Sequence, residues 1–101
     1  AEPMAQRALE LRRRLLPTGH PDLSASLNLM GWITHERGRS ADAVPFLEDA
    51  IRIRRADSAR APGDLSRSLN DLGVVFNALR RYDEAKVVLR EALALRLTIY
   101  G

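Results

Sequence analysis

The chain has 101 residues, of which 46% are hydrophobic, so it can form one domain with a modest core. Its formal net charge is only +3, and the pI near 10.2 therefore permits nucleic-acid binding without arguing for it. Cys is absent, which excludes a disulfide framework and thiolate metal ligands, and no apolar run approaches the length of a membrane span.

One short stretch of sequence occurs twice in nearly the same form, 42 positions apart. Residues 22–31 read DLSASLNLMG, and residues 64–73 read DLSRSLNDLG. A further step of 42 backwards aligns the first residues of the chain with the second half of the same unit. A fixed period of this kind indicates a repeat architecture. The predicted organisation is a single domain of a half repeat and two full repeats, over residues 1–17, 18–59 and 60–101.

Five helices and no strand are predicted, because apolar residues recur at spacings of three and four throughout each unit. In chain order, the expected helices cover about residues 1–16, 22–37, 40–57, 64–79 and 82–98. Gly38 is expected to end the second helix, and Ser40 is the candidate N-cap of the third.

Two glycines stand in the middle of predicted helices, where Gly costs about 0.5–1 kcal/mol relative to Ala. Because both Gly31 and Gly73 accept this cost, a neighbouring element is expected to come too close for a Cβ at these positions. The matching shallow surface is expected at four alanines of the following helices: Ala43, Ala50, Ala85 and Ala92. Helices locked in antiparallel pairs would bury their outer faces only by stacking into a solenoid.

These motifs resemble the tetratricopeptide repeat, in which a Leu-x-x-Leu/Met-Gly block precedes a helix with two spaced alanines. The 42-residue period resembles the kinesin-light-chain type of this repeat, which is widespread in bacterial signalling proteins, and the resemblance covers essentially the whole chain. It implies an all-α solenoid of antiparallel helix pairs with a right-handed superhelical turn, as part of a longer array. It also implies that the third helix continues through Pro45 with a slightly loosened first turn.

Each copy departs from the usual pattern of this repeat at one position near its turn. The large aromatic residue that usually lies near the turn is present as Tyr82 but replaced by Ser40 in the first copy. A common turn glycine is kept as Gly38 but becomes Arg80 in the second copy. Both departures concern the tightness of the turns.

No constellation of residues indicates catalysis, a cofactor or a metal site. His20 lies in a His-Pro-Asp turn, where a structural role is expected, and His35 is read as a solvated or groove-lining residue. The serines that recur in register have no His partner in register, and no phosphate-binding loop is present. The segment is therefore predicted not to be an enzyme.

The resemblance implies that the first helix of each repeat lines a concave groove. A stacked pair of Asn28 and Asn70 would suit an extended peptide backbone, and the alternative is that the two bond each other. Arg67 could receive a carboxylate. Trp32 is either half-buried packing between repeats or an anchor for a partner. The residues predicted to contact a partner are Asn28, Trp32, His35, Arg67, Asn70 and Asn77.

Three arginines, Arg12, Arg54 and Arg96, recur once in each second helix. They could form a stripe for an anion or nucleic acid. They could instead cover the next helix pair and bond an acid there, such as Asp22 or Asp64. The structural interpretation is preferred because this repeat type commonly carries Arg at that position, and nucleic acid is not an expected partner.

The predicted function is a cytoplasmic protein-interaction module, or scaffold, that binds a peptide or partner domain in the concave groove. The alternative is a structural spacer or sensor-arm segment of a multidomain regulatory ATPase. Neither terminal helix is predicted to have a polar covering helix. Apolar residues such as Leu93 and Leu97 lie near the end of the last predicted helix. Self-association through the uncapped ends is therefore also expected.

Overall fold

The computed structural model describes residues 21–56 and 62–100, and no strand occurs among them. These residues form four α-helices: α2 (Pro21–Glu36), α3 (Ser40–Ala56), α4 (Pro62–Ala78) and α5 (Tyr82–Tyr100). Each lies within about two residues of a predicted range, but the described part of the chain holds four helices rather than five. The remaining predicted helix, over 1–16, lies outside the described residues, as does the half repeat 1–17.

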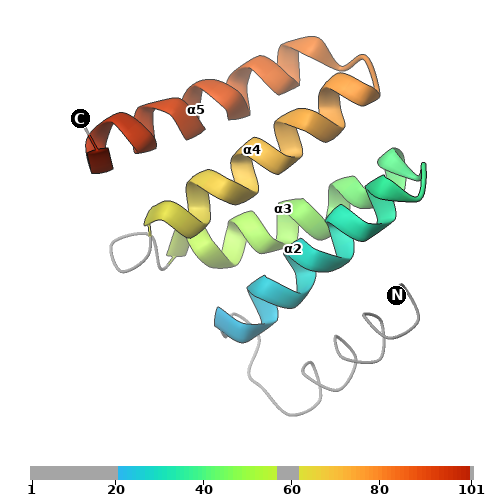
Figure 1. Ribbon diagram of the computed structural model, residues 1–101, viewed down its shortest axis with the longest axis horizontal. Helices are drawn as coiled ribbons and strands as arrows, with labels where there is room; N and C mark the ends of the chain where they lie inside the picture. Colours follow the sequence, from blue (N-terminus) through green and yellow to red (C-terminus); the bar gives the residue numbers. More distant parts are fainter. Residues whose placement is uncertain (1–20, 57–61, 101) are drawn as a thin grey trace.

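The four helices form two successive antiparallel pairs (Figure 1). α2 packs against α3, α4 packs against α5, and α4 also packs against α3, so that each helix contacts its neighbours in the sequence. α4 touches α2 at a few points as well, which brings the first helices of the two pairs side by side. None of the described helices is long and apolar enough to cross a bilayer.

The two turns within the helix pairs have the same geometry. Gly38 has a φ of 81°, its N–H donates to the His35 carbonyl at 2.9 Å, and the Arg39 N–H donates to the Thr34 carbonyl at 3.1 Å. This bonding closes the C-terminus of α2 by satisfying its last carbonyls. The turn from α4 to α5 repeats both bonds 42 residues later, at 3.0 and 2.8 Å, although Arg80 takes the left-handed conformation there with a φ of 61°.

Helix α3 begins differently from the prediction. The Ala43 N–H donates to the Arg39 carbonyl at 3.2 Å, so Ser40 already lies inside the first turn. The Ser40 hydroxyl lies 2.8 Å from His35 Nδ1, which ties the end of α2 to the start of α3. The prediction that Ser40 caps α3 was therefore wrong. The prediction that the helix continues through Pro45 is confirmed, since α3 extends to Ala56.

The apolar core consists of two clusters that meet on α3. Leu27 of α2 and Leu69 of α4 are each only 1% exposed, as the predicted helical faces require. The cluster between α2 and α3 contains Leu23, Leu27, Met30, Ala50 and Ile53. The larger cluster joins α3, α4 and α5 and contains Ala43, Val44, Leu47, Ile51, Leu65, Leu69, Leu72, Val75, Phe76, Ala85 and Ala92. Because α3 contributes to both, it is the element that joins the two pairs.

The mid-helix glycines make close contacts with the following helix, and the closest of these are with a leucine rather than with the expected alanines. A Cβ added at Gly31 would lie 2.8 Å from Leu47 Cγ, and one added at Gly73 would lie 2.5 Å from Leu89 Cγ. Both distances are shorter than normal van der Waals contact, so each position excludes a side chain. Each leucine lies between the two alanines of its helix, and the Cβ added at Gly31 would also lie 3.3 Å from the Ala43 carbonyl oxygen. The alanine spacing therefore pointed to the correct region, although a leucine makes the closest contact.

Candidate partner-binding groove

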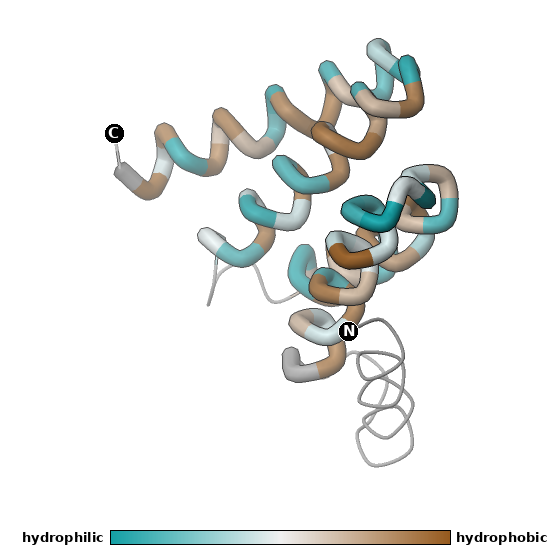
Figure 2. Tube along the Cα trace, turned by 45° about the vertical axis from the view of Figure 1, so that its right-hand side comes forward, coloured by the Kyte–Doolittle hydropathy of each residue, from teal (hydrophilic) through white to brown (hydrophobic). Residues whose placement is uncertain are grey.

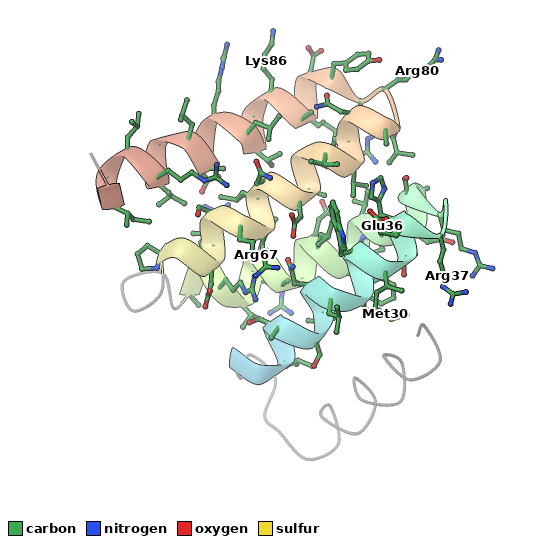
Figure 3. All side chains as sticks on the ribbon, viewed as in Figure 1. Met30, Glu36, Arg37, Arg67, Arg80 and Lys86 are labelled. Carbon is green, nitrogen blue, oxygen red and sulfur yellow. The ribbon has the colours of Figure 1, made fainter. Side chains whose placement is uncertain are left out.

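A cavity of about 390 Å³ lies between the two first helices, α2 and α4. Its walls combine apolar side chains from α2 with charged side chains from α3 and α4. The lining residues are Ala25, Asn28, Leu29, Trp32, Arg54, Arg67 and Asp71. Figure 3 shows Arg67, which comes from the N-terminal half of α4. This cavity is therefore the candidate for the groove that the repeat architecture is expected to form.

A polar network ties the two walls of the groove together. Asn28, which is only 7% exposed, donates from Nδ2 to Asp71 Oδ2 at 3.1 Å, and its Oδ1 accepts a bond from the Ser68 hydroxyl at 2.7 Å. Both ends of the amide are therefore engaged with α4. The alternative in which Asn28 and Asn70 bond each other was wrong, because Asn28 bonds to Ser68 and Asp71, which flank Asn70 on α4.

Arg54 extends this network from α3 to both first helices. Its Nε donates to the Ser24 hydroxyl at 3.3 Å, and its Nη1 donates to the Ser68 hydroxyl at 2.6 Å and to the Asp64 main-chain carbonyl at 3.1 Å. The structural interpretation of this arginine is confirmed. Its acceptors are two hydroxyls and a carbonyl, however, rather than a carboxylate.

The charge on Arg54 is held in a partly desolvated setting. Burial lowers the pKa of Arg54, and the neighbouring cation Arg67 lowers it further. The carboxylates of Asp64 and Asp71 oppose this shift. The groove therefore contains two cations. Arg54 is half-buried near the carboxylates of Asp64 and Asp71, and Arg67 is exposed to solvent.

Trp32 forms the apolar side of the groove together with Leu29. Trp32 is half-buried, and Leu29 is 53% exposed. The Trp32 ring also lies against His35, with the ring centroids 5.3 Å apart and the planes tilted by 50°. Because His35 also bonds to Ser40, it supports the tryptophan from the side away from the cavity lining.

The structure separates the six predicted groove residues into two sets. Asn28, Trp32 and Arg67 line the cavity, whereas His35, Asn70 and Asn77 do not. Asn70 is half-buried and Asn77 is exposed, both on α4. Arg54 recurs as Arg12 and Arg96. Arg96 is exposed on α5, whereas Arg12 and the predicted turn at His20 lie outside the described residues.

The six predicted residues leave out four of the lining residues: Ala25, Leu29, Arg54 and Asp71. One signal was present for two of them, since the repeated decapeptide changes from Leu29 in the first copy to Asp71 in the second. Where the two copies differ, the packing that both repeats share does not determine the residue, so such a position is free to serve a ligand. Arg54 was noticed but assigned only to packing, whereas it also lines the cavity.

A second cavity, of about 580 Å³, lies between α3, α4 and α5. Its lining includes Ile51, Leu69, Leu72 and Val88, with the stems of Arg52 and Arg55 at the rim. Arg55 also forms a two-point ion pair with Glu91, with one bond of 3.1 Å, and so links α3 to α5. In the described helices, no group of three or more His, Asp or Glu side chains is placed to hold a metal ion.

Comparison with known proteins agrees with the repeat architecture. Two family models, both described as tetratricopeptide repeat, match residues 1–56 and residues 65–101. No curated protein matches the chain. The first match alone covers more than half of the chain, and together with the helical pairs, the 42-residue register and the groove it shows that the chain belongs to the tetratricopeptide repeat family.

Proposed function

We propose that this chain is a protein-interaction module that binds an extended peptide, or an extended segment of a partner domain, in the groove between α2 and α4. Tetratricopeptide repeats generally mediate protein–protein interaction. The observation that carries the proposal is the cavity of about 390 Å³, which combines exposed apolar side chains with an exposed guanidinium. We assign the chain to the kinesin-light-chain type of repeat on its 42-residue period, and we expect no enzymatic activity.

The polar network in the groove decides which residues contact the ligand. The amide of Asn28 is already bonded at both ends, so a ligand would have to break existing bonds to use it. Arg67 is exposed and offers a fork of donors to a carboxylate. Leu29 and the half-buried Trp32 offer apolar area next to it. The direct contacts are therefore assigned to Trp32, Leu29 and Arg67, and Asn28 is assigned to holding the wall.

A random-peptide selection on the whole chain, followed by measured affinities, tests this proposal. Trp32 is the only Trp of the chain and lines the groove, so binding should change its fluorescence. Replacing Arg67 by Ala should weaken the selected peptide about tenfold or more, because a hydrogen bond to a charged group is lost. Lys86→Ala, on α5 and outside the groove lining, is the matched control and should change the affinity less than about twofold.

The alternative, a structural spacer with no partner of its own, predicts a different result. Peptides would then be selected only weakly, and their binding would leave the fluorescence of Trp32 unchanged. Equal affinities for Arg67→Ala and the parent chain would also reject the groove as the binding site.

A further inference from the structure

The cavity of about 580 Å³ between α3, α4 and α5 shares no lining residue with the groove. Its floor is apolar and comes from α3 and α4, where Ile51, Leu69 and Leu72 are all buried. Val88 forms its wall on α5, a helix along which Figure 2 shows apolar segments alternating with polar ones. Protein interiors leave few voids larger than a water molecule, so a space of this size can hold a small ligand.

A comparison of the two repeats explains why this space is present. Val88 stands where the preceding repeat has Phe46, and Leu72 beside it stands where that repeat has Met30. Phe46 packs against the apolar cluster that contains Met30. Because valine is much smaller than phenylalanine, it leaves empty the volume that a phenyl ring would take. The size of the cavity therefore depends on the residue at position 88.

The rim of the cavity carries two guanidinium groups, of Arg52 and Arg55, and one carboxylate, of Glu48. Arg55 is already engaged in its two-point ion pair with Glu91 on α5. The ion pair of Arg52 with Asp49 spans 4.0 Å, which is too long for a hydrogen bond, and the Arg52 side chain is 62% exposed. The donors of Arg52 are therefore the ones that can receive an anion.

The charges at the rim favour a ligand with a single negative charge. Two cations against one carboxylate attract a monoanion, but Glu48 and Glu91 would repel a doubly charged group such as a phosphate. A carboxylate also matches the fork of donors on a guanidinium. The favoured ligand therefore has a carboxylate at its polar end and an apolar body.

We propose that the cavity between α3, α4 and α5 binds a small amphipathic carboxylate, such as a medium-chain aliphatic acid. The carboxylate pairs with Arg52, and the apolar chain covers the floor of the cavity and Val88. The ion pair between Arg55 and Glu91 stays in place and links the two helices that flank the ligand. This site is separate from the peptide groove, so the inference does not depend on the proposed function.

Decanoate, used below the concentration at which it forms micelles, is the probe for this site. Its binding to the whole chain is followed through the methyl signals of the lining residues in NMR spectra: Ile51, Leu69, Leu72 and Val88. These signals should shift until the site is saturated. Decyltrimethylammonium, which has the same chain and the opposite charge, should bind about tenfold more weakly or not at all.

The apolar part of the site is tested by Val88→Phe, which introduces the residue of the preceding repeat. This variant should weaken decanoate binding about tenfold or more, because the phenyl ring fills the space that the chain would occupy. Val87→Phe is the matched control and should change the affinity less than about twofold, since Val87 is 67% exposed and does not line the cavity. Urea unfolding checks that both variants are folded.

The charged end of the site is tested by Arg52→Gln. Because Arg52 is exposed, this variant should fold as the parent chain does, and it tests the site even if phenylalanine does not fit at position 88. It should weaken decanoate about tenfold and remove the preference for decanoate over decyltrimethylammonium. Arg90→Gln, which is exposed on α5 and outside the lining, is the matched control.

Each of four results would overturn the proposal. Decanoate could leave the methyl signals of the lining residues unchanged, or the two probes could bind equally well. Arg52→Gln could bind decanoate as tightly as the parent chain. Binding could also be lost in Arg67→Ala and kept in Val88→Phe, which would place the probe in the peptide groove instead.

Discussion

Gly38 and Arg80 occupy the same left-handed position of two turns whose hydrogen bonds match pair by pair. The left-handed conformation places the Cβ of an ordinary residue close to a carbonyl oxygen, which costs about 1–2 kcal/mol. Glycine avoids this cost but loses more freedom on folding. The second turn therefore carries strain that the first turn lacks.

Replacing Arg80 by Gly should increase the free energy of unfolding by about 0.5–1 kcal/mol, the difference between these two effects. The reciprocal control is Gly38→Ala, which should decrease it by about 1 kcal/mol. A Cβ at Gly38 would meet no atom within 4 Å, so this control reports backbone conformation alone. Urea unfolding of both variants measures the effect, and a loss of stability in Arg80→Gly would contradict it.

The close contact at Gly73 predicts a change of the opposite sign to helix propensity. Leu is the better helix former, so Gly73→Leu should stabilise an isolated helix. In the protein it should destabilise by about 1–3 kcal/mol or more, because Leu89 already occupies the space. Thermal unfolding distinguishes the two outcomes, and a higher Tm would show that the contact yields without strain.

Arg54 and Arg96 are the same repeat position in two environments. Arg54→Ala removes three hydrogen bonds that join α3 to α2 and α4, so we expect a loss of about 1–3 kcal/mol. Arg96→Ala is the matched control in the same chain and should change stability by less than about 0.5 kcal/mol, because Arg96 is exposed. Equal effects in urea unfolding would mean that the hydrogen bonds of Arg54 contribute nothing net.

The apolar face residues were predictable from the sequence because each repeat buries the same side of the same helices. The partners across the groove were not. Equivalent residues of successive repeats do not face each other, because the second pair is displaced relative to the first. Asn28 therefore meets Ser68 and Asp71, which are 40 and 43 positions away, rather than Asn70 at 42.

At the scale of the elements, α3 is the helix on which the fold depends. One side of α3 belongs to the cluster with α2 and the other to the cluster with α4 and α5. Sequence periodicity located this helix and the region of its close contact with Gly31, but it gave no sign of the ion pair from Arg55 to Glu91. That pair depends on how far α5 lies from α3, which only the stacking of the two pairs determines.

The link between Arg55 and Glu91 should contribute only modestly to stability. Its side chains are 53% and 34% exposed, so solvent and salt screen the charges. A double-mutant cycle with Arg55→Ala and Glu91→Ala should give a coupling of about 0.2–1 kcal/mol that decreases in high salt. The i,i+3 pair of Arg81, just before α5, and Glu84, in its first turn, is the local control, since its strength does not depend on the packing of α3 against α5.

At the scale of the whole molecule, the fold is flat, with extents of 37, 32 and 17 Å along its three principal axes. The sequence predicted this architecture through its period, and the family matches agree with it. The helix expected over 1–16 and the uncapped first end lie outside the described residues, so the boundaries at 1–17, 18–59 and 60–101 stay predictions, as does the handedness of the superhelix.

The order of contacts along this stack sets the route by which the chain folds. Packing joins α2 to α3, α3 to α4 and α4 to α5, and only the few contacts of α2 with α4 skip a helix. Most of the helix packing therefore joins neighbours in the sequence, which keeps the entropic barrier low. Proteins dominated by such local contacts fold within microseconds to milliseconds. Folding can start at either hairpin and spread to its neighbour, so no distant strand or terminus has to be found before the core begins to form.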